Sequence, residues 1–158
     1  MSPTLYILCG PAGCGKTTWA FDFMQYDSDV RYVSRDAIRF SMISNEEEYF
    51  SHEKEVFRRF SDCIAQTLID GFDVIADATH INEASRHKLT KAIDEYTANY
   101  NIIYIVFLVD VETCIERNKN REGLARVPEQ VIRDMCLNFK IPTLDEDKRA
   151  ISVIKERE

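Results

Sequence analysis

The chain has 158 residues, of which 45% are hydrophobic and 30% are charged, an ordinary balance for a soluble globular protein. This length has room for one domain with a single core, and we expect residues 1–158 to form it. The formal net charge of −7 argues against a protein that coats nucleic acid through a broad basic surface, but does not exclude an enzyme that holds one strand end with a few arginines.

The first elements predicted along the chain are a strand and a helix. Residues 5–9 form a short apolar run, which predicts a buried strand, and apolar residues then recur at helical spacing over 16–24. A second short strand is predicted over 31–33. Ser34 follows it as a cap for one turn of helix.

A longer helix and a third strand are predicted next. Asn45 and Glu48 form a variant capping box, and Gly71 ends the helix behind it. The third strand is predicted over 72–76 and leads directly into Asp77. The apolar stripe of the helix consists of Tyr49, Val56, Phe57, Phe60, Ile64 and Leu68.

The second half of the chain continues the alternation of helices and strands. Asn82 starts a helix, and the most apolar segment, 102–109, predicts a fully buried strand. A basic irregular segment over 117–126 precedes Pro128, which we expect at the first position of a helix. A last strand is predicted over 150–154.

These elements predict an α/β fold. Strands that are apolar on both sides and alternate with helices indicate a parallel sheet of about five strands, with helices on both faces. The segment over about 117–127 adds an arginine-bearing lid to this fold. No internal repeat, low-complexity tract or linker interrupts the pattern.

Cysteine usage and the N-terminus point to the cytoplasm. No apolar run approaches the roughly 20 residues that span a bilayer, and no basic region with an apolar stretch behind it marks a secretion signal. The five cysteines form no close pair of the kind that binds zinc, so we expect free thiols in a reducing compartment. They are Cys9, Cys14, Cys63, Cys114 and Cys136.

Residues 10–17 match the phosphate-loop pattern G-x-x-x-x-G-K-[ST] in full, between a predicted strand and a predicted helix. The predicted α/β sheet is therefore expected to be of the P-loop NTPase type. The glycines let backbone N–H groups point at phosphate oxygens, and the helix adds the positive end of its dipole. We expect Lys16 to reach the β- and γ-phosphates of ATP and Thr17 to ligate Mg²⁺. The expected nucleotide-binding residues are Gly10, Pro11, Ala12, Gly13, Cys14, Gly15, Lys16, Thr17, Thr18, Arg117 and Arg121.

Asp77 ends an apolar strand, which is the usual form of the second carboxylate linked to Mg²⁺ in P-loop proteins. The structural alternative is a strand-terminal cap for the turn that follows. Residues 77–80 lack the glycine of a GTPase D-x-x-G turn, and 118–121 lack the acid that would bind guanine. The motifs therefore argue against a signalling GTPase.

A phosphotransferase needs a base for the acceptor hydroxyl, a cation for the acceptor's own charge, and arginines around the transferring phosphoryl group. Asp36 is the candidate base, and Arg39 lies on the same side of one helical turn. Arg117, Arg121 and Arg126 crowd the segment that we expect to close as a lid. A surface ion pair between Asp36 and Arg39, and a solvated charged loop, are the structural alternatives.

Four stretches in this order resemble the 5′-polynucleotide kinase family, specifically the kinase domain of the bacteriophage-type enzyme that phosphorylates 5′-OH ends of DNA and RNA. They are "GPAGCGKTTWA", "SRDAIR", "ADATHIN" and "ERNKNREGLARVPEQVIRDM". The resemblance runs from the phosphate loop to about residue 140. The phosphate loop marks only the superfamily, whereas the Arg-Asp-x-x-Arg element and the arginine lid are considerably more selective.

The resemblance implies roles for the charged residues. Lys16, Asp36 and Arg121 would be catalytic, with Asp36 as the general base that activates the 5′-OH and Arg121 on the transferring phosphates. Arg39 would hold the nucleic-acid phosphate on the 3′ side of the acceptor nucleotide. Arg117 would support the nucleotide, and ATP and Mg²⁺ would be the cofactors.

The resemblance also implies an acceptor site near the third strand. Asp77, Thr79 and His80 would line it, and Arg86 on the next helix would touch the acceptor strand. Family members usually carry Asn at the position of His80. The phage enzyme continues into a phosphatase domain, whereas this chain ends at Glu158 with no D-x-D-x-T motif, so a 5′-kinase without 3′-phosphatase activity is expected.

The expected function is therefore an ATP-dependent 5′-hydroxyl polynucleotide kinase in the cytoplasm, that of the host if the chain is phage-encoded. The alternative is a kinase of a small molecule, nucleoside or nucleotide on the same scaffold, since a fold does not determine its acceptor. A non-catalytic ATP-binding module is the third possibility, against which Asp36 and the lid arginines argue. The sequence leaves open DNA or RNA, ATP or GTP, and the oligomeric state.

Overall fold

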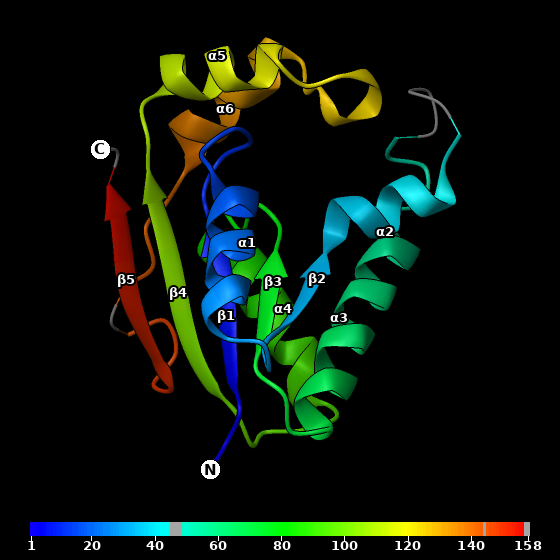
Figure 1. Ribbon diagram of the computed structural model, residues 1–158, viewed down its shortest axis with the longest axis vertical. Coiled ribbons are helices and arrows are strands. Elements are labelled where there is room, and N and C mark those ends of the chain that lie inside the picture. Colours follow the sequence, from blue (N-terminus) through cyan, green and yellow to red (C-terminus); the bar gives the residue numbers. More distant parts are fainter. Residues whose placement is uncertain (45–48, 144, 157–158) are drawn as a thin grey trace.

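Five parallel strands form one sheet in the computed structural model, which describes residues 1–44, 49–143 and 145–156. The spatial order of the strands is β2-β3-β1-β4-β5, and every neighbouring pair is parallel (Figure 1). This confirms the predicted parallel α/β sheet. The strands are β1 (Thr4–Cys9), β2 (Arg31–Ser34), β3 (Val74–Asp77), β4 (Asn101–Leu108) and β5 (Ala150–Glu156).

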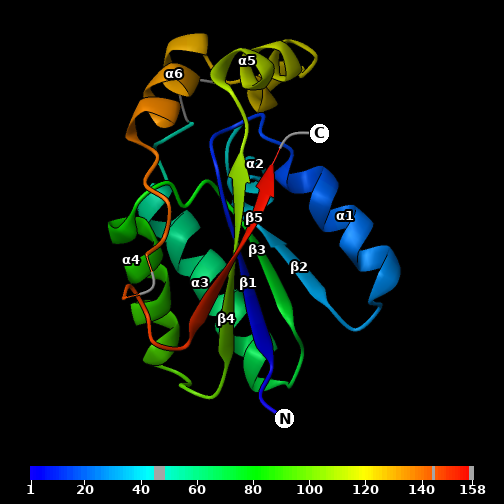
Figure 2. The same cartoon turned by 90° about the vertical axis from the view of Figure 1, so that its left-hand side faces the viewer.

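Helices cover both faces of the sheet, as the sequence predicts. Helices α3 and α4 lie on one face and α1 on the other, while α5 and α6 lie above the carboxyl ends of the strands (Figures 1 and 2). The helices are α1 (Lys16–Tyr26), α2 (Arg35–Met42), α3 (Glu53–Ile69), α4 (Glu83–Asp94), α5 (Val111–Lys119) and α6 (Glu129–Asn138), with the 3₁₀ helix η2 (Gly123–Ala125) between the last two.

Each face of the sheet has its own apolar core, because successive residues of a strand point to opposite faces. Leu5 and Ile7 of β1 join the core formed with α3 and α4, whereas Leu8 joins the core formed with α1, α5 and α6. All three side chains are fully buried. The central strands are thus apolar on both sides, which is the pattern expected of a parallel sheet covered by helices.

Helix α2 is longer than the single turn predicted after the second strand. It continues to Met42, and Ser34 caps it, because the Ser34 hydroxyl accepts a hydrogen bond of 3.1 Å from the Ala37 backbone N–H. The capping role of Ser34 is confirmed.

Helix α3 begins later than the apolar stripe suggests. It starts at Glu53, and the capping box expected at Asn45 and Glu48 lies outside the described residues. The inclusion of Tyr49 in the stripe was wrong, because this residue precedes the helix. Its ring packs instead on Arg39, whose guanidinium carbon lies 4.8 Å from the ring centroid.

Two other helix starts agree closely with the sequence. Asn82 caps α4 through a capping box with Ser85, whose N–H donates to the Asn82 side chain at 2.8 Å. Pro128 occupies the cap position of α6, so this helix begins one residue later than predicted, at Glu129.

None of the five cysteines forms a disulfide in the structure. Within residues 1–44, 49–143 and 145–156, no helix combines the length and the apolar content needed to cross a membrane.

The parallel arrangement brings the polar segments of the sequence to one edge of the sheet. The segments that follow β1, β2, β3 and β4 all leave the sheet at its carboxyl edge, where α5 and the segment behind it extend across the top toward α2 (Figure 1). Open α/β sheets place their ligands at this edge.

A buried ion pair holds the segment before β5 against α4. Arg86 donates to both carboxylate oxygens of Glu146, from Nε at 2.7 Å and from Nη2 at 2.8 Å. Its Nη1 donates to the His80 carbonyl at 2.8 Å. The side chains of Arg86 and Glu146 are only 1% and 4% exposed. Because water cannot stabilise these charges, each depends on the opposite charge of the other.

Replacing one partner of this pair should destabilise the fold strongly. We expect Arg86→Met to lower the free energy of unfolding by about 3–5 kcal/mol, because Glu146 then remains buried without a partner. The double variant Arg86→Met/Glu146→Leu should recover most of this loss, because no isolated charge remains. Urea unfolding of both variants measures the difference, and equal losses would contradict the charge argument.

Candidate active site

The phosphate loop connects β1 to α1 and depends on glycine at two positions. Gly13 and Gly15 have φ of +85° and +101°, in the left-handed region that other residues rarely adopt. At Gly13 there is also no space for a side chain, since a Cβ would lie 2.5 Å from the Cys114 carbonyl oxygen of α5. The loop is therefore packed directly against the helix that carries the arginine segment.

Lys16 directs its ammonium group into this loop. Its Nζ donates to the Gly10 and Pro11 carbonyls, each at 2.9 Å, and the residue is 8% exposed. The positive charge thus lies among the backbone groups of the loop instead of in solvent. A charge held in this way is available to phosphate oxygens that enter the loop.

Thr17 and Asp77 meet across the carboxyl edge of the sheet. The Thr17 hydroxyl donates to Asp77 Oδ2 at 2.9 Å, and Asp77 is 7% exposed. A hydroxyl and a carboxylate are oxygen ligands of the kind that Mg²⁺ takes in P-loop proteins, so this pair fits the cation that we expect there.

Tyr32 is a member of this group that the sequence analysis missed. Its hydroxyl donates to the same Oδ2 of Asp77 at 2.5 Å. Burial, followed by the nearby Asp77 carboxylate, raises the pKa of Tyr32 well above its usual range, so the phenol remains a donor. The only sequence signal was its place on β2, two residues before the helix cap Ser34.

Asp36 and Arg39 lie together at the start of α2, as their spacing predicts. Arg39 Nη1 donates to Asp36 Oδ1. The two side chains differ in exposure, with 56% for Asp36 and 9% for Arg39. Asp36 is thus a carboxylate that is held by a cation and is still open to solvent.

Glu53, the first residue of α3, fixes Arg39 in this position. Arg39 donates to it from Nε at 2.7 Å and from Nη2 at 2.5 Å. Burial alone would raise the pKa of Glu53, but the hydrogen bonds from Arg39 outweigh it and hold that pKa below its usual range. Sequence reasoning missed Glu53, because nothing in the intervening residues indicates that α3 returns to α2.

Two of the three lid arginines differ from every other described arginine. Arg117 is the exception, because its Nη1 donates a hydrogen bond of 3.4 Å to the Gly13 carbonyl oxygen. Among the described residues, the side chains of Arg121 and Arg126 have no hydrogen-bond or ion-pair partner, whereas each described arginine outside the lid has at least one. The lid therefore presents cations that no carboxylate of the described chain neutralises.

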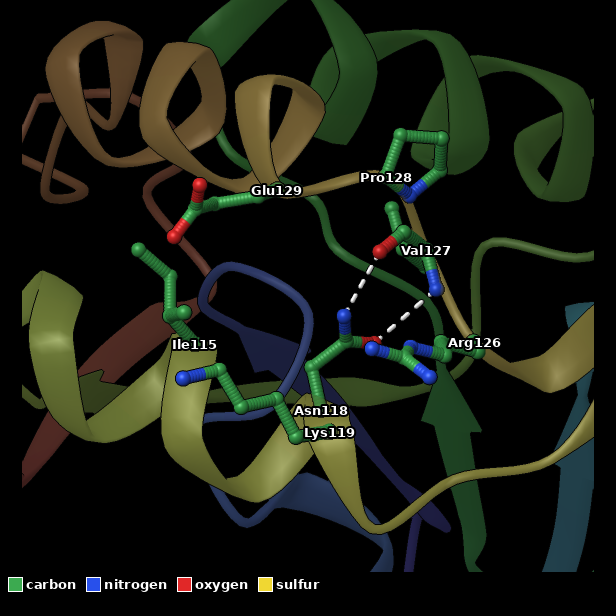
Figure 3. Close-up of a pocket in the computed structure, with 7 residues that line it drawn as sticks. All are labelled: Ile115, Asn118, Lys119, Arg126, Val127, Pro128 and Glu129. Carbon is green, nitrogen blue, oxygen red and sulfur yellow. Dashed lines mark hydrogen bonds between the residues drawn. The ribbon is translucent and has the colours of Figure 1, made fainter.

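Asn118 closes the base of the lid. Its side-chain amide donates to the Val127 carbonyl at 2.6 Å and accepts from the Val127 N–H at 2.9 Å, as the two dashed lines in Figure 3 show. Asn118 is 3% exposed. A pocket of about 350 Å³ lies around this contact, lined by Ile115, Asn118, Lys119, Arg126, Val127, Pro128 and Glu129.

His80 is buried instead of facing an acceptor. It is 5% exposed, its ring stacks on Phe60, and its Nδ1–H donates to the Leu8 carbonyl at 2.7 Å. Its φ of +43° lies in the left-handed region, where Asn and His are enriched among non-glycine residues. This backbone conformation explains why Asn suits the same position in the family that the sequence resembles.

Thr79 and Arg86 also have structural partners. The Thr79 carbonyl accepts from the Gly10 N–H at 2.9 Å and so holds the start of the phosphate loop. Arg86 is 1% exposed and directs its guanidinium group to Glu146 and the His80 carbonyl. The expected contact of Arg86 with an acceptor strand is therefore corrected, because its donors are used inside the protein.

A family comparison matches residues 5–142 to the family described as an AAA domain. The matched range holds the phosphate loop, Asp36, Asp77 and the whole lid. The chain belongs to this family, and its sheet and loop have the fold of a P-loop kinase.

Solved structures with the same fold act on different acceptors, according to their names. A chain of the Pnkp1/Rnl/Hen1 RNA repair complex has 24% identity and a TM-score of 0.71, over 86% of this chain and 43% of that one. A fungal RNA kinase has 16% identity and a TM-score of 0.68, over 100% of this chain and 38% of that one. A sugar kinase from Janibacter sp. HTCC2649 has 15% identity and a TM-score of 0.65, over 98% of this chain and 86% of that one.

These likenesses establish the fold and leave the acceptor to the chemistry of the site. The chain spans less than half the length of the repair-complex chain and of the fungal RNA kinase. It spans most of the length of the sugar kinase.

Removing the clasp at the base of the lid should increase opening of the lid. We expect Asn118→Ala to be cleaved by trypsin after Arg121 and Arg126 roughly 30-fold faster, because two hydrogen bonds of about 1 kcal/mol each are lost. Limited proteolysis followed by mass spectrometry measures the rate. Asn120→Ala, at an exposed neighbouring position, is the matched control, and equal rates in the two variants would contradict a clasp.

His80 should make stability depend on pH. Burial lowers its pKa to about 4, against an unfolded value near 6.5. Between these two pH values, His80 is protonated in the unfolded chain but neutral in the folded chain. The free energy of unfolding should therefore fall as pH decreases from about 6.5 to about 4. His80→Asn suits the left-handed backbone and does not titrate, so its urea unfolding should depend less on pH in this window. An unchanged dependence would contradict the assignment.

Proposed function

We propose that this member of the AAA domain family is an ATP-dependent polynucleotide 5′-hydroxyl kinase, which transfers the γ-phosphate of ATP to a 5′-OH end of DNA or RNA. The observation that carries the proposal is Asp36, an exposed carboxylate held by Arg39 at the carboxyl edge of the sheet. Asp36 lies two residues beyond Ser34, which pairs in register with Asp77. ATP binding alone needs no such carboxylate.

The donor half of the reaction rests on the phosphate loop. The backbone N–H groups and Lys16 bind the β- and γ-phosphates and offset their charge. Mg²⁺, held by Thr17 and Asp77, would further neutralise the β- and γ-oxygens when bound. Tyr32 keeps the Asp77 carboxylate oriented, because it donates to the same oxygen as Thr17 does.

The acceptor half rests on Asp36 and Arg39. The Asp36 carboxylate accepts the proton of the 5′-OH as the oxygen attacks the γ-phosphorus, and the bond to the bridging oxygen of ADP breaks. Nε and Nη2 of Arg39 donate to Glu53, whereas Nη1 donates to the exposed Asp36 and, at 3.4 Å, to the Tyr49 hydroxyl. We assign Nη1 to the phosphate on the 3′ side of the acceptor nucleotide, which would replace one of these two partners.

The lid supplies the remaining charge. Arg121 is partly exposed and has no partner among the described residues, so no internal ion pair needs to be broken when it closes on the γ-phosphate. Arg117, already against the loop, supports the nucleotide. Closure excludes water, which favours transfer to the acceptor over hydrolysis.

A kinase of a small molecule is the second candidate. The sugar kinase matches this chain over nearly the full length of both, whereas the RNA kinase and repair-complex chains are more than twice as long as the part matched. The overall charge of −7 also suits a compact acceptor better than a polyanion.

The acceptor is identified by offering labelled ATP to a panel. The panel comprises a 5′-OH DNA oligonucleotide, a 5′-OH RNA oligonucleotide, a 3′-mononucleotide, free nucleosides and simple sugars. We expect label on the oligonucleotides and on the 3′-mononucleotide, since the phosphate 3′ to the acceptor is what Arg39 would bind. Label on nucleosides or sugars alone would reject the polynucleotide assignment.

The base assignment is tested by Asp36→Asn. We expect transfer to fall by about 10²–10⁴-fold, because the amide cannot accept the hydroxyl proton. Binding of ATP, followed by calorimetry, should stay within about twofold, because Asp36 is not part of the phosphate loop. Asp29→Asn, an exposed aspartate ahead of β2, is the matched control. Turnover that is retained in Asp36→Asn would refute the assignment.

A further inference from the structure

Two cations from different helices meet on one aromatic ring next to the proposed base. The Lys88 ammonium of α4 lies 4.2 Å from the ring centroid of Phe57, and the guanidinium carbon of Arg35 lies 5.6 Å from the same centroid. Phe57 belongs to α3 and is partly buried against the core. We call Arg35, Phe57 and Lys88 the ring cluster.

The positive charge of the ring cluster is poorly compensated. Within the described part of the chain, Lys88 has no carboxylate within ion-pair distance. Arg35 reaches only Glu53, at 3.4 Å, and Glu53 is already engaged by Arg39 at 2.5 Å. One carboxylate thus serves two guanidinium groups.

Arg35 is also held at an energetic disadvantage. Its Nε is buried without a hydrogen-bond partner among the described residues. Burial lowers the pKa of Arg35, and the charge of Arg39 acts in the same direction, whereas the Glu53 charge opposes both. An additional anion would stabilise the charge of a guanidinium group in this position, because it would accept hydrogen bonds from it.

The location of the ring cluster shows which anion it suits. Arg35 is the chain neighbour of Asp36, so the cluster begins at the proposed base and extends across Phe57 to α4. The phosphates of ATP are assigned to the phosphate loop, to which none of the ring-cluster residues belongs. We therefore assign an anion at the ring cluster to the acceptor, and two cations on different helices suit an acceptor with more than one phosphate.

We propose that the ring cluster binds the phosphodiester backbone of the acceptor strand, beyond the nucleotide that carries the 5′-OH. Arg35 and Lys88 contact the phosphates, and Phe57 holds the two cations in place through cation–π contacts. The inference rests on the proposed function and deepens it, because it makes a polymer of several nucleotides the preferred acceptor. A small acceptor would lack the further phosphates that the ring cluster is proposed to bind.

Lys88→Gln tests the proposal without disturbing the fold, since Lys88 is exposed. We expect KM for a 5′-OH octanucleotide to rise about tenfold, with kcat unchanged and KM for a 3′-mononucleotide unchanged. Equilibrium binding of the octanucleotide, labelled at its 3′ end and followed by anisotropy, should lose about 0.7 from its slope of log affinity against log salt, as one phosphate contact is removed.

Lys91→Gln is the matched control, an exposed lysine on the same helix with no assigned contact to the acceptor. It should behave as the wild type does with both substrates. If Lys88→Gln keeps the wild-type KM and salt slope for the octanucleotide, the proposed role of the ring cluster is overturned, while the proposed function stands. An equal rise of KM for the mononucleotide would also overturn it, because the lysine would then act at the first nucleotide. A wild-type enzyme that phosphorylates no oligonucleotide would overturn both proposals.

Discussion

Parallel pairing of the strands is the constraint on which the site depends. Because all five strands run in one direction, the segments that follow β1 to β4 leave the sheet at the same edge. The phosphate loop, the helix that begins with Arg35 and Asp36, the Asp77 carboxylate and the lid therefore share one edge, although they are spread over more than a hundred residues. The hydrogen bonds from Thr17 to Asp77 and from the Gly10 N–H to the Thr79 carbonyl link two of these segments directly.

Charge is distributed unevenly over the molecule, and the distribution separates structural from functional cations. Arg86 is buried and bound to Glu146, so it acts as a structural cation. Arg121, Arg126 and Lys88 have no carboxylate partner among the described residues, and Arg121 and Arg126 follow α5 above the carboxyl edge of the sheet. An acidic protein can thus present local positive charge where phosphate must be bound.

The sequence predicted helix starts well where a cap residue lies next to the helix. It predicted poorly those side-chain positions that depend on residues far away in the chain. Ser34 and Asn82 cap helices as expected, because a side chain that bonds the first turn is a local property. Tyr49 was assigned to a helix on apolar spacing alone, but its ring is needed against Arg39. Glu53 and Tyr32 complete the site and were not predicted, since their partners come from other elements of the fold.

By itself, the sequence determined the fold class, the phosphate loop and the pairing of Asp36 with Arg39, because each depends on residues that are neighbours in the chain. Only the tertiary structure decided which charged residues face inward. His80 and Arg86 were expected to contact the acceptor, yet both are buried and donate to the Leu8 carbonyl, to Glu146 and to the His80 carbonyl. Burial is a property of the whole packed chain, because any polar group removed from water must find its partner wherever the fold provides one.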